Sequence, residues 1–192
     1  MIGDNIMNKV NSDPKYVFPE MPLDIVLGGK YKEVITDKYV YFKTGPLSQW
    51  TTSPFNAHGI RFLNCEQYMM YRKALAFNDV ESIELIKQTP NPPLVKDIGR
   101  KVKGFEQWYW DNIKMDVVID GNKEKFAQNP HLRKYLLSTG DKILVEATRE
   151  DSIWGIGVDI VDLRIDNNIS WNGSNLLGEA LMIVRRDCNY VE

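Results

Sequence analysis

Histidine and cysteine are scarce in this chain of 192 residues, which contains two of each. Cys65 and Cys188 are too few and too far apart in sequence for a disulfide scaffold, so two free thiols are expected. Together with His58 and His131 they form no ligand set at the spacings of known zinc sites. We therefore expect chemistry that is independent of a transition metal and uses no cofactor.

An excess of positive charge and a long apolar run are also missing. The formal net charge is −2, from 24 Lys and Arg against 26 Asp and Glu. A protein that coats nucleic acid non-specifically would need a basic excess. No apolar run approaches about 18 residues, and the N-terminus lacks the charged-then-apolar pattern of a secretion signal. These features predict a cytoplasmic protein that does not associate with membranes.

The hydrophobic periodicity predicts a single, mainly α domain with a few short β-strands. Residues 1–35 are weakly patterned and interrupted by prolines, so they are expected to form an N-terminal arm, with a short hairpin near its end and the domain itself over residues 36–192. Helices are predicted over 64–77, 79–88, 94–104, 105–127, 129–137 and 175–185, strands over 39–42, 53–55, 59–62 and 143–147, and a surface excursion over 159–171.

The predicted helix over 64–77 has the most informative pattern. Asn64 is a good N-cap, and Gln67 can close a capping box. At about 100° per residue, Glu66 and Lys73 fall on one stripe with two methionines and a phenylalanine. A carboxylate and an ammonium among apolar side chains are suited to line a cavity. The alternative is a partly exposed amphipathic helix with both charges at its margins.

The acidic residues indicate a possible chemistry. Glu66 lies in a first helical turn, where the helix dipole favours ionisation, so it suits a base or an electrostatic stabiliser. Asp151 precedes Trp154 by three residues, in a loop whose Gly155 and Gly157 allow close backbone approach. Two carboxylates and a lysine around a stacking tryptophan could cleave a bond at the anomeric carbon of ribose, because that transition state is cation-like.

Other candidate residues have both functional and structural interpretations. Trp50 and Trp110 could stack on a ring or fill the core. Arg100 could meet a phosphate or face solvent at a helix end. The backbone amides of capped helix starts, such as that at Asn175, suit anions. Cys65 is disfavoured as a nucleophile, because neither histidine has an evident relation to it.

A series of short motifs occurs in the order, and with the gaps, of the NADAR family, also called YbiA-like. They are Glu66-x6-Lys73, Gly99-Arg100, Trp110 followed by Lys125-Phe126, Leu136-Leu-x-Thr-Gly140, Leu144-Val-Glu146, Asp151-x2-Trp-Gly-x-Gly157 and Asn175-x-Leu-Gly178. The chain resembles this family from about Tyr39 to Arg186. The resemblance implies a mainly α, YbiA-like fold and N-glycosidase activity on ribosyl compounds. Some members hydrolyse phosphorylated intermediates of riboflavin synthesis, and others remove ADP-ribose from guanine in nucleic acid or nucleotides.

The resemblance also implies roles for individual residues. Catalytic roles fall on Glu66, Lys73 and Asp151, where Lys73 would meet the sugar or base or form an imine with an opened ribose. Gln49 replaces the asparagine that usually precedes the aromatic residue at position 50. Substrate-binding roles fall on Trp50, Arg100, Trp110, Lys125, Trp154, Gly155, Gly157, Asn175 and Gly178.

Two departures from the riboflavin-type members favour an ADP-ribosyl substrate. Those members carry an acid where this chain has Ile156, and a histidine where it has Gln67. The leading hypothesis is a metal-independent hydrolase that removes ADP-ribose from guanine, with Glu66 and Trp154 in one cleft. The alternatives are an N-glycosidase acting on riboflavin intermediates, a non-catalytic sensor of NAD or ADP-ribose, and a nucleic-acid-binding module, which the acidic balance disfavours. The substrate is expected to be an ADP-ribosylated nucleotide or nucleic acid, or a ribosyl phosphate; the sequence makes no prediction of the oligomeric state.

Overall fold

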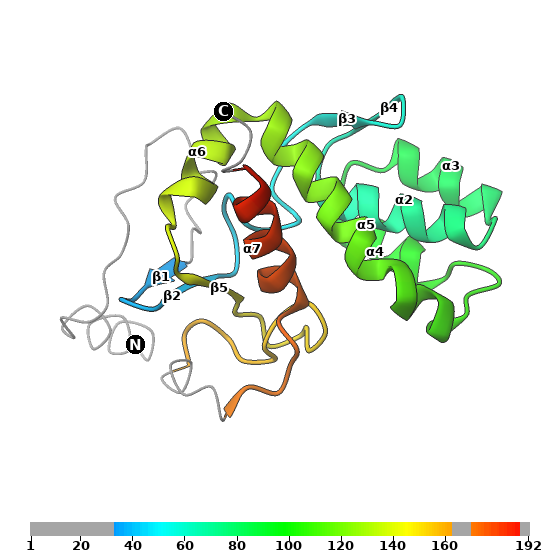
Figure 1. The fold of residues 1–192 in the computed structure, drawn as a ribbon. Helices are drawn as coiled ribbons and strands as arrows, with labels where there is room; N and C mark the ends of the chain where they lie inside the picture. The colour runs from blue at the N-terminus through cyan, green and yellow to red at the C-terminus, as the bar shows by residue number, and fades with distance from the viewer. Residues whose placement is uncertain (1–32, 163–169, 189–192) are drawn as a thin grey trace, which may run out of the picture. The chain divides into compact units, whose positions relative to one another are not determined.

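The computed structural model describes residues 33–162 and 170–188 (Figure 1). The mainly α fold with a few short strands that the sequence predicts is confirmed. The chain divides into two compact units, residues up to 48 with 138–182 and residues 49–137 with 183–192, which are described separately. The elements are β1 (Glu33–Ile35), β2 (Tyr39–Phe42), β3 (Phe55–Ala57), β4 (Ile60–Phe62), α2 (Cys65–Ala76), α3 (Val80–Gln88), α4 (Pro92–Arg100), α5 (Gln107–Gln128), α6 (Pro130–Ser138), β5 (Ile143–Glu146) and α7 (Leu176–Cys188).

The first unit is built on a three-stranded sheet in the order β1-β2-β5 (Figure 1). β1 is antiparallel to β2, and β2 is parallel to β5, with Tyr39 opposite Ile143. All of β2 is buried, as its run of aromatic and β-branched residues predicts. β1 takes residues 33–35 of the predicted arm into the sheet, whereas the rest of the predicted hairpin lies outside the described residues. The apolar core of this unit includes Val34, Tyr39, Tyr41, Val145, Ala147, Ile156, Val158 and Ile160.

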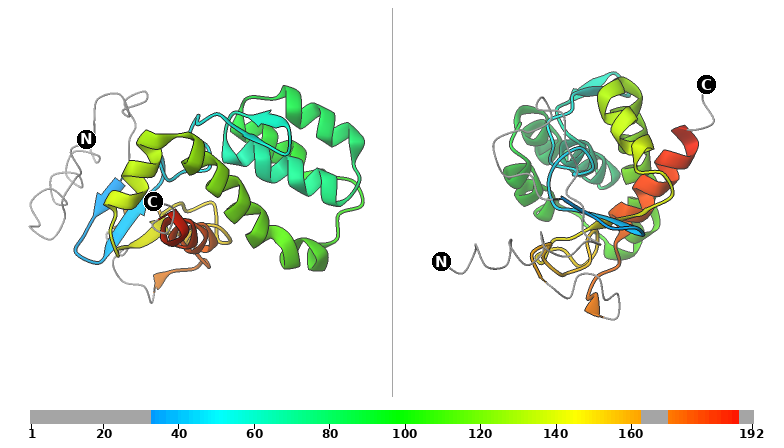
Figure 2. Two further views of the ribbon diagram at one scale, coloured as in Figure 1. Left: turned by 45° about the horizontal axis from the view of Figure 1, so that its top comes forward. Right: turned by 90° about the vertical axis from the view of Figure 1, so that its left-hand side faces the viewer.

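In the second unit α2 packs against α3, α4 and α5, with the β3–β4 hairpin beside them (Figure 2). The predicted hairpin is confirmed with its first strand shifted to 55–57. His58 and Gly59 at its turn have φ values of 50° and 76°. Positive φ at both central residues is the geometry that closes a two-residue hairpin with the right twist.

The helix α2 begins as predicted, but its capping and burial differ from the sequence-based picture. The Asn64 side chain accepts a hydrogen bond from the Gln67 backbone N–H, at 2.9 Å. The Gln67 carboxamide reaches the N–H of Leu63 at 2.8 Å, in place of the N–H of Asn64. Nearly all of the first two turns is buried. Glu66 therefore does not lie at an exposed margin of the helix, whereas Lys73 is half-buried and Leu75 is exposed.

One further helix start departs from the prediction. α4 begins at Pro92, before the predicted start at 94, because Asn91 caps it and prolines at the first two positions need no N–H partner. Gly121 lies inside α5. A Cβ at position 121 would lie 2.5 Å from the Cδ1 atom of Tyr68, so glycine is needed there for the close packing of α5 on α2.

The remaining predicted elements are found close to their expected positions. α6 starts with Pro130 directly after Asn129, and Gly140, with a φ of 56°, follows its end. The predicted surface excursion over 159–171 lies partly outside the described residues. No helix within 33–162 or 170–188 is long and apolar enough to cross a membrane.

Candidate functional site

Glu66 lies in the first turn of α2 and is only 3 % exposed. Its Oε2 atom accepts a hydrogen bond from Nε1 of Trp50 at 3.3 Å, and its backbone N–H donates to the Gln49 carbonyl at 3.1 Å. The Trp50 side chain is 44 % exposed. Burial of a carboxylate is costly unless it is hydrogen-bonded, and the positive end of the helix dipole also favours the anion here. The structure thus brings two predicted site residues into direct contact.

Lys73 lies two turns beyond Glu66 on the same face of α2, a rise of about 10 Å. Its Nζ atom is 4.1 Å from the centre of the Phe105 ring and 5.8 Å from that of Trp110. Burial lowers the pKa of Lys73 below its ordinary value, and no acidic group of the described chain counteracts this shift. A partly desolvated amine between two rings loses its proton more easily, which suits a nucleophile.

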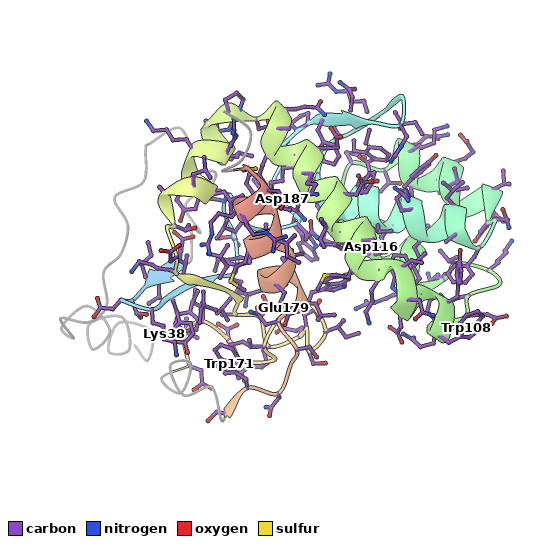
Figure 3. The ribbon with its side chains drawn as sticks, viewed as in Figure 1. Lys38, Trp108, Asp116, Trp171, Glu179 and Asp187 are labelled. Carbon is purple, nitrogen blue, oxygen red and sulfur yellow. The ribbon has the colours of Figure 1, made fainter. Side chains whose placement is uncertain are left out.

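Trp110 is buried. Trp108, near the start of the same helix, is exposed (Figure 3). Residues two apart on a helix point to different sides, so the two tryptophans differ although both lie near the start of α5. The structure therefore gives Trp110 an inward position beside Lys73. Phe105, the other ring at this amine, was missed by the sequence analysis, because no periodic pattern connects a residue before α5 to the Lys73 stripe.

Lys125 is completely buried, with its Nζ atom 5.0 Å from the centre of the Phe126 ring. Burial lowers its pKa, and the nearby Cys65 partly opposes the shift. Cys65 donates weakly to the Gly121 carbonyl, 3.6 Å away, and burial raises the pKa of its thiol to about 11. A protonated buried thiol is a poor nucleophile, in agreement with the sequence-based argument. Lys125 thus lies near Cys65, the residue before Glu66.

Arg100 lies at the end of α4 with its side chain 65 % exposed, and its Nη1 atom is 3.3 Å from Oδ1 of Asp97. One turn earlier, Lys96 places its Nζ atom 5.9 Å from the centre of the Trp50 ring. The sequence analysis missed Lys96. The available signal was its spacing of four residues from Arg100, which puts both side chains on one flank of the helix.

The Trp154 loop, residues 151–157, belongs to the first unit and is shaped by Asp151. The Asp151 Oδ1 atom accepts hydrogen bonds from the N–H groups of Ile153 and Trp154, at 3.1 and 2.8 Å. Its backbone carbonyl accepts from the N–H of Gly157, which has a φ of 66°. The carboxylate therefore orders the turn that presents Trp154.

The start of α7 is joined to this loop through backbone hydrogen bonds. The N–H groups of residues 175, 176 and 177 donate to the carbonyls of Gly155, Ile153 and Trp154, at 3.1 to 3.2 Å. These are amides that a helix start otherwise leaves without a partner. The amides that the sequence analysis considered as an anion site are consequently engaged by the loop.

Asn175 and Gly178 attach α7 to β5. The Asn175 side chain, directly before α7, donates to the Leu144 carbonyl at 2.9 Å and accepts from the Glu146 N–H at 3.0 Å. A Cβ at Gly178 would lie 2.0 Å from the Leu144 carbonyl oxygen. Close packing of a helix against a strand is a sufficient reason for both residue types.

The predicted site residues thus form two groups. The second unit contains Glu66, Lys73, Trp50, Arg100, Trp110 and Lys125. The first contains Asp151, Trp154, Gly155, Gly157, Asn175 and Gly178. The shared cleft of Glu66 and Trp154, and the role assigned to each residue, stay predictions. In the described ranges no three His, Cys, Asp or Glu side chains gather as metal ligands would, and metal independence stays a prediction as well.

The two departures from the riboflavin-type pattern have different structural contexts. Gln67 is buried, and its carboxamide also donates to the Ile86 carbonyl at 3.0 Å and the Thr89 carbonyl at 3.1 Å. Its role in this structure is the attachment of α2 to the end of α3, so it no longer supports a particular substrate. Ile156 is fully buried in the apolar core of the first unit. The absence of an acid at position 156 therefore still distinguishes this chain from the riboflavin-type members.

Comparison with known proteins supports the resemblance seen in the sequence. The NADAR domain model matches residues 38–189. N-glycosidase R617 of Acanthamoeba polyphaga mimivirus is 39 % identical over 79 % of this chain and 97 % of its own length. A riboflavin biosynthesis protein of Vibrio vulnificus is 31 % identical over 61 % of this chain and 29 % of its own length.

A solved structure supports the fold independently. The NMR structure of the Escherichia coli protein YbiA covers 82 % of this chain and 89 % of that one, with a TM-score of 0.67 and 26 % sequence identity. The NADAR match runs through both compact units, so the single, mainly α domain predicted from the sequence is confirmed. Because the NADAR model matches most of the length of this chain, the chain belongs to the NADAR family.

Proposed function

We propose that this protein is an N-glycosidase that removes ADP-ribose from guanine by hydrolysing the bond between ribose C1 and the guanine amino nitrogen. The N-glycosidase class is supported by the name of the mimivirus relative, which this chain covers almost completely. The observation that carries the proposal is the buried Glu66 carboxylate, held by the Trp50 N–H. A fixed, poorly solvated anion is suited to stabilise a cation-like anomeric carbon.

In the first route, Glu66 acts on the ribose directly. The C1–N bond breaks with its electron pair moving to nitrogen, and the departing base takes up a proton. Water then adds to C1 and gives up a proton, which yields free ADP-ribose and guanine with its amino group restored. The Glu66 carboxylate stabilises the positive charge that develops on the sugar before water adds.

A second route uses Lys73, whose lowered pKa favours the neutral amine. The amine adds to C1 of a ring-opened ribose in place of the base amine, which leaves with a proton. Water then hydrolyses the resulting imine and releases the amine of Lys73. Reduction with borohydride during turnover separates the routes, because only an imine is trapped as a stable adduct on Lys73.

The ADP-ribosyl substrate is supported by Ile156, which leaves the Trp154 loop without the acid of the riboflavin-type members. The competing substrate is a phosphorylated riboflavin intermediate. It is supported by the Vibrio vulnificus relative, although the match covers 29 % of that protein. The two substrates differ in the base and in the number of phosphates, so they can be compared directly.

The test offers the purified full-length chain three substrates: an ADP-ribosylated guanosine nucleotide, an oligonucleotide ADP-ribosylated on guanine, and a ribosylaminouracil 5-phosphate. Release of each base is followed by liquid chromatography and mass spectrometry, with and without EDTA. We expect cleavage of a guanine substrate at equal rates in both buffers. Cleavage of the uracil compound alone would contradict the proposed guanine substrate. If none of the three is cleaved while a known family member is active in the same assay, the proposal that this protein is an enzyme is wrong.

A further inference from the structure

We infer that Lys96 and Arg100 form a phosphate track along one flank of α4, in which Lys96 binds the ribose 5-phosphate and Arg100 the next phosphate of a diphosphate. The inference rests on the proposed function, because Glu66 marks the position of the anomeric carbon. It adds a residue, Lys96, and a direction in which the substrate lies. Both candidate substrates carry a phosphate on the ribose 5-oxygen, so Lys96 would serve either.

The first support is the relative direction of α2 and α4. At their starts, the Asn64 Nδ2 atom donates to the Pro90 carbonyl at 3.4 Å. Further along, Gly99 lies directly against Met70, where an added Cβ would be 2.0 Å from the Met70 sulfur. The two helices therefore run side by side in the same direction. A ligand that extends from Glu66 along α2 also extends along α4.

The second support is the indole that connects Glu66 with Lys96. Trp50 donates its N–H to the Glu66 carboxylate at 3.3 Å, and the Lys96 ammonium lies 5.9 Å from the centre of the same ring. The carboxylate and the ammonium are thus separated by no more than these two distances and the width of the ring. That upper limit leaves room for the C1 atom and the 5-phosphate of one ribose between the two charges, and the half-exposed indole offers its surface to the ribose.

The third support is the position of Arg100. Val95 and Gly99 are the buried residues of α4, so Lys96 and Arg100 share the flank next to them. They are four residues apart, a rise of about 6 Å. Arg100 is paired with Asp97 on the exposed surface, and such pairs are weak enough for a phosphate to replace the carboxylate. A guanidinium also matches phosphate geometry better than an ammonium does.

The two cations are expected to differ in which ligands they bind. A ribose 5-phosphate has one phosphate and would engage Lys96 alone, whereas ADP-ribose has two and would engage both residues. Lys101, the next residue of the chain, is an exposed lysine in the C-cap position of α4. It provides a matched control for loss of one positive charge.

The experiment measures calorimetric binding of ADP-ribose and of ribose 5-phosphate to the full-length chain and to K96M, K96R, R100M and K101M. We expect K96M to raise Kd for both ligands about tenfold, the effect of losing one charge-assisted contact, and K96R to restore most of the affinity. R100M should raise Kd for ADP-ribose and leave ribose 5-phosphate unchanged, and K101M should change neither. Thermal melts by circular dichroism confirm that each variant is folded.

Binding by a folded K96M that equals the wild type, or no binding of either ligand by the wild type, would overturn the track. An equal increase in Kd for both ligands in R100M would contradict the proposed direction of the phosphate track. Because binding of the products needs no turnover, the result is independent of the catalytic assay. A chain that shows the expected Kd pattern but cleaves no ribosyl base retains the phosphate track and loses the proposed function.

Discussion

The turn that carries Glu66 and the Trp154 loop belong to different compact units, and they hold their polar groups in different ways. At the Glu66 turn, a buried carboxylate is held by the side chain of Trp50. In the Trp154 loop, the Asp151 carboxylate binds backbone N–H groups, and the loop carbonyls bind the start of α7.

We infer from this difference that the Glu66 turn serves mainly the reaction, whereas the Trp154 loop serves mainly the stability of the fold. Removal of the Glu66 charge takes away a group whose burial opposes folding, so the fold should tolerate it while the reaction does not. The loop and α7 consist of mutually satisfied backbone groups at close distances, so changes there should be felt first in stability. The following predictions test this separation, in order of decreasing effect.

The largest effect is expected for Glu66→Gln. The amide keeps the shape and an oxygen that can accept from Trp50, but it removes the negative charge at the anomeric carbon. We expect kcat to fall about 1000-fold, the upper range for loss of one electrostatic stabiliser, with little change in Tm. Steady-state hydrolysis and calorimetric melting measure the two quantities. The control Glu84→Gln, at an exposed surface pair on α3, should change neither; full activity of Glu66→Gln would remove Glu66 from the mechanism.

The next largest effect is expected for Gly178→Ala, and it should appear in stability. The new Cβ would lie 2.0 Å from the Leu144 carbonyl oxygen, a backbone atom that cannot move without displacing β5. We expect the free energy of unfolding to fall by about 3 kcal/mol, as in severe overpacking. Gly99→Ala is the matched control, because its Cβ meets the flexible end of Met70 and should cost about 1 kcal/mol. Equal losses in urea unfolding would show that rigidity of the neighbour does not decide the cost.

Lys73→Met should reduce kcat about 100-fold, the lower range for loss of a proton-transferring or nucleophilic group. Its effect on stability has a defined pH dependence. The folded pKa of Lys73 lies below 10.5, so the cost of burying the charge is present at neutral pH and is relieved as pH rises through the folded pKa. The stability of the variant relative to the wild type should therefore decrease between pH 7 and 10.5 in chemical denaturation. A pH-independent difference would contradict the desolvation of Lys73.

The smallest effect is expected for Trp50→Phe, which keeps a ring beside Lys96 but removes the N–H donated to Glu66. We expect a decrease in kcat of about tenfold, the effect of one hydrogen bond to a charged group. Trp108→Phe is the matched control, since Trp108 also donates to a carboxylate, Glu106, on the exposed surface. Similar losses in both variants would assign no special role to the Trp50–Glu66 contact.

The helix boundaries were predictable because their signals are local. Asn64 and Asp79 cap helices at the predicted places, and Asn129 with Pro130 begins another. The stripe that joins Glu66 and Lys73 also follows from helical periodicity alone. The parallel pairing of β2 with β5 was not predictable in the same way, because about a hundred residues separate the strands and their register depends on tertiary packing.

The site was predictable in part. Lysines are rarely fully buried, so nothing local in the sequence distinguishes Lys125 from a surface lysine that could meet phosphate. The contact of Lys96 with Trp50 depends on how α4 packs on α2, which no spacing within α4 specifies. Asn175 lies directly before α7 as predicted, but its side-chain hydrogen bonds to β5 depend on tertiary packing that the sequence does not show.

The carboxamide of Gln67 has a consequence for the residue before it. One side chain serves the N–H at position 63, just ahead of α2, and the carbonyls of Ile86 and Thr89 at the end of α3. Fraying of the end of α3 would break hydrogen bonds of Gln67, so we expect it to loosen the first turn of α2, where Glu66 lies. The amide protons of these two helix ends should exchange with solvent as one cooperative group, which makes a peripheral helix a determinant of how firmly the buried acid is held.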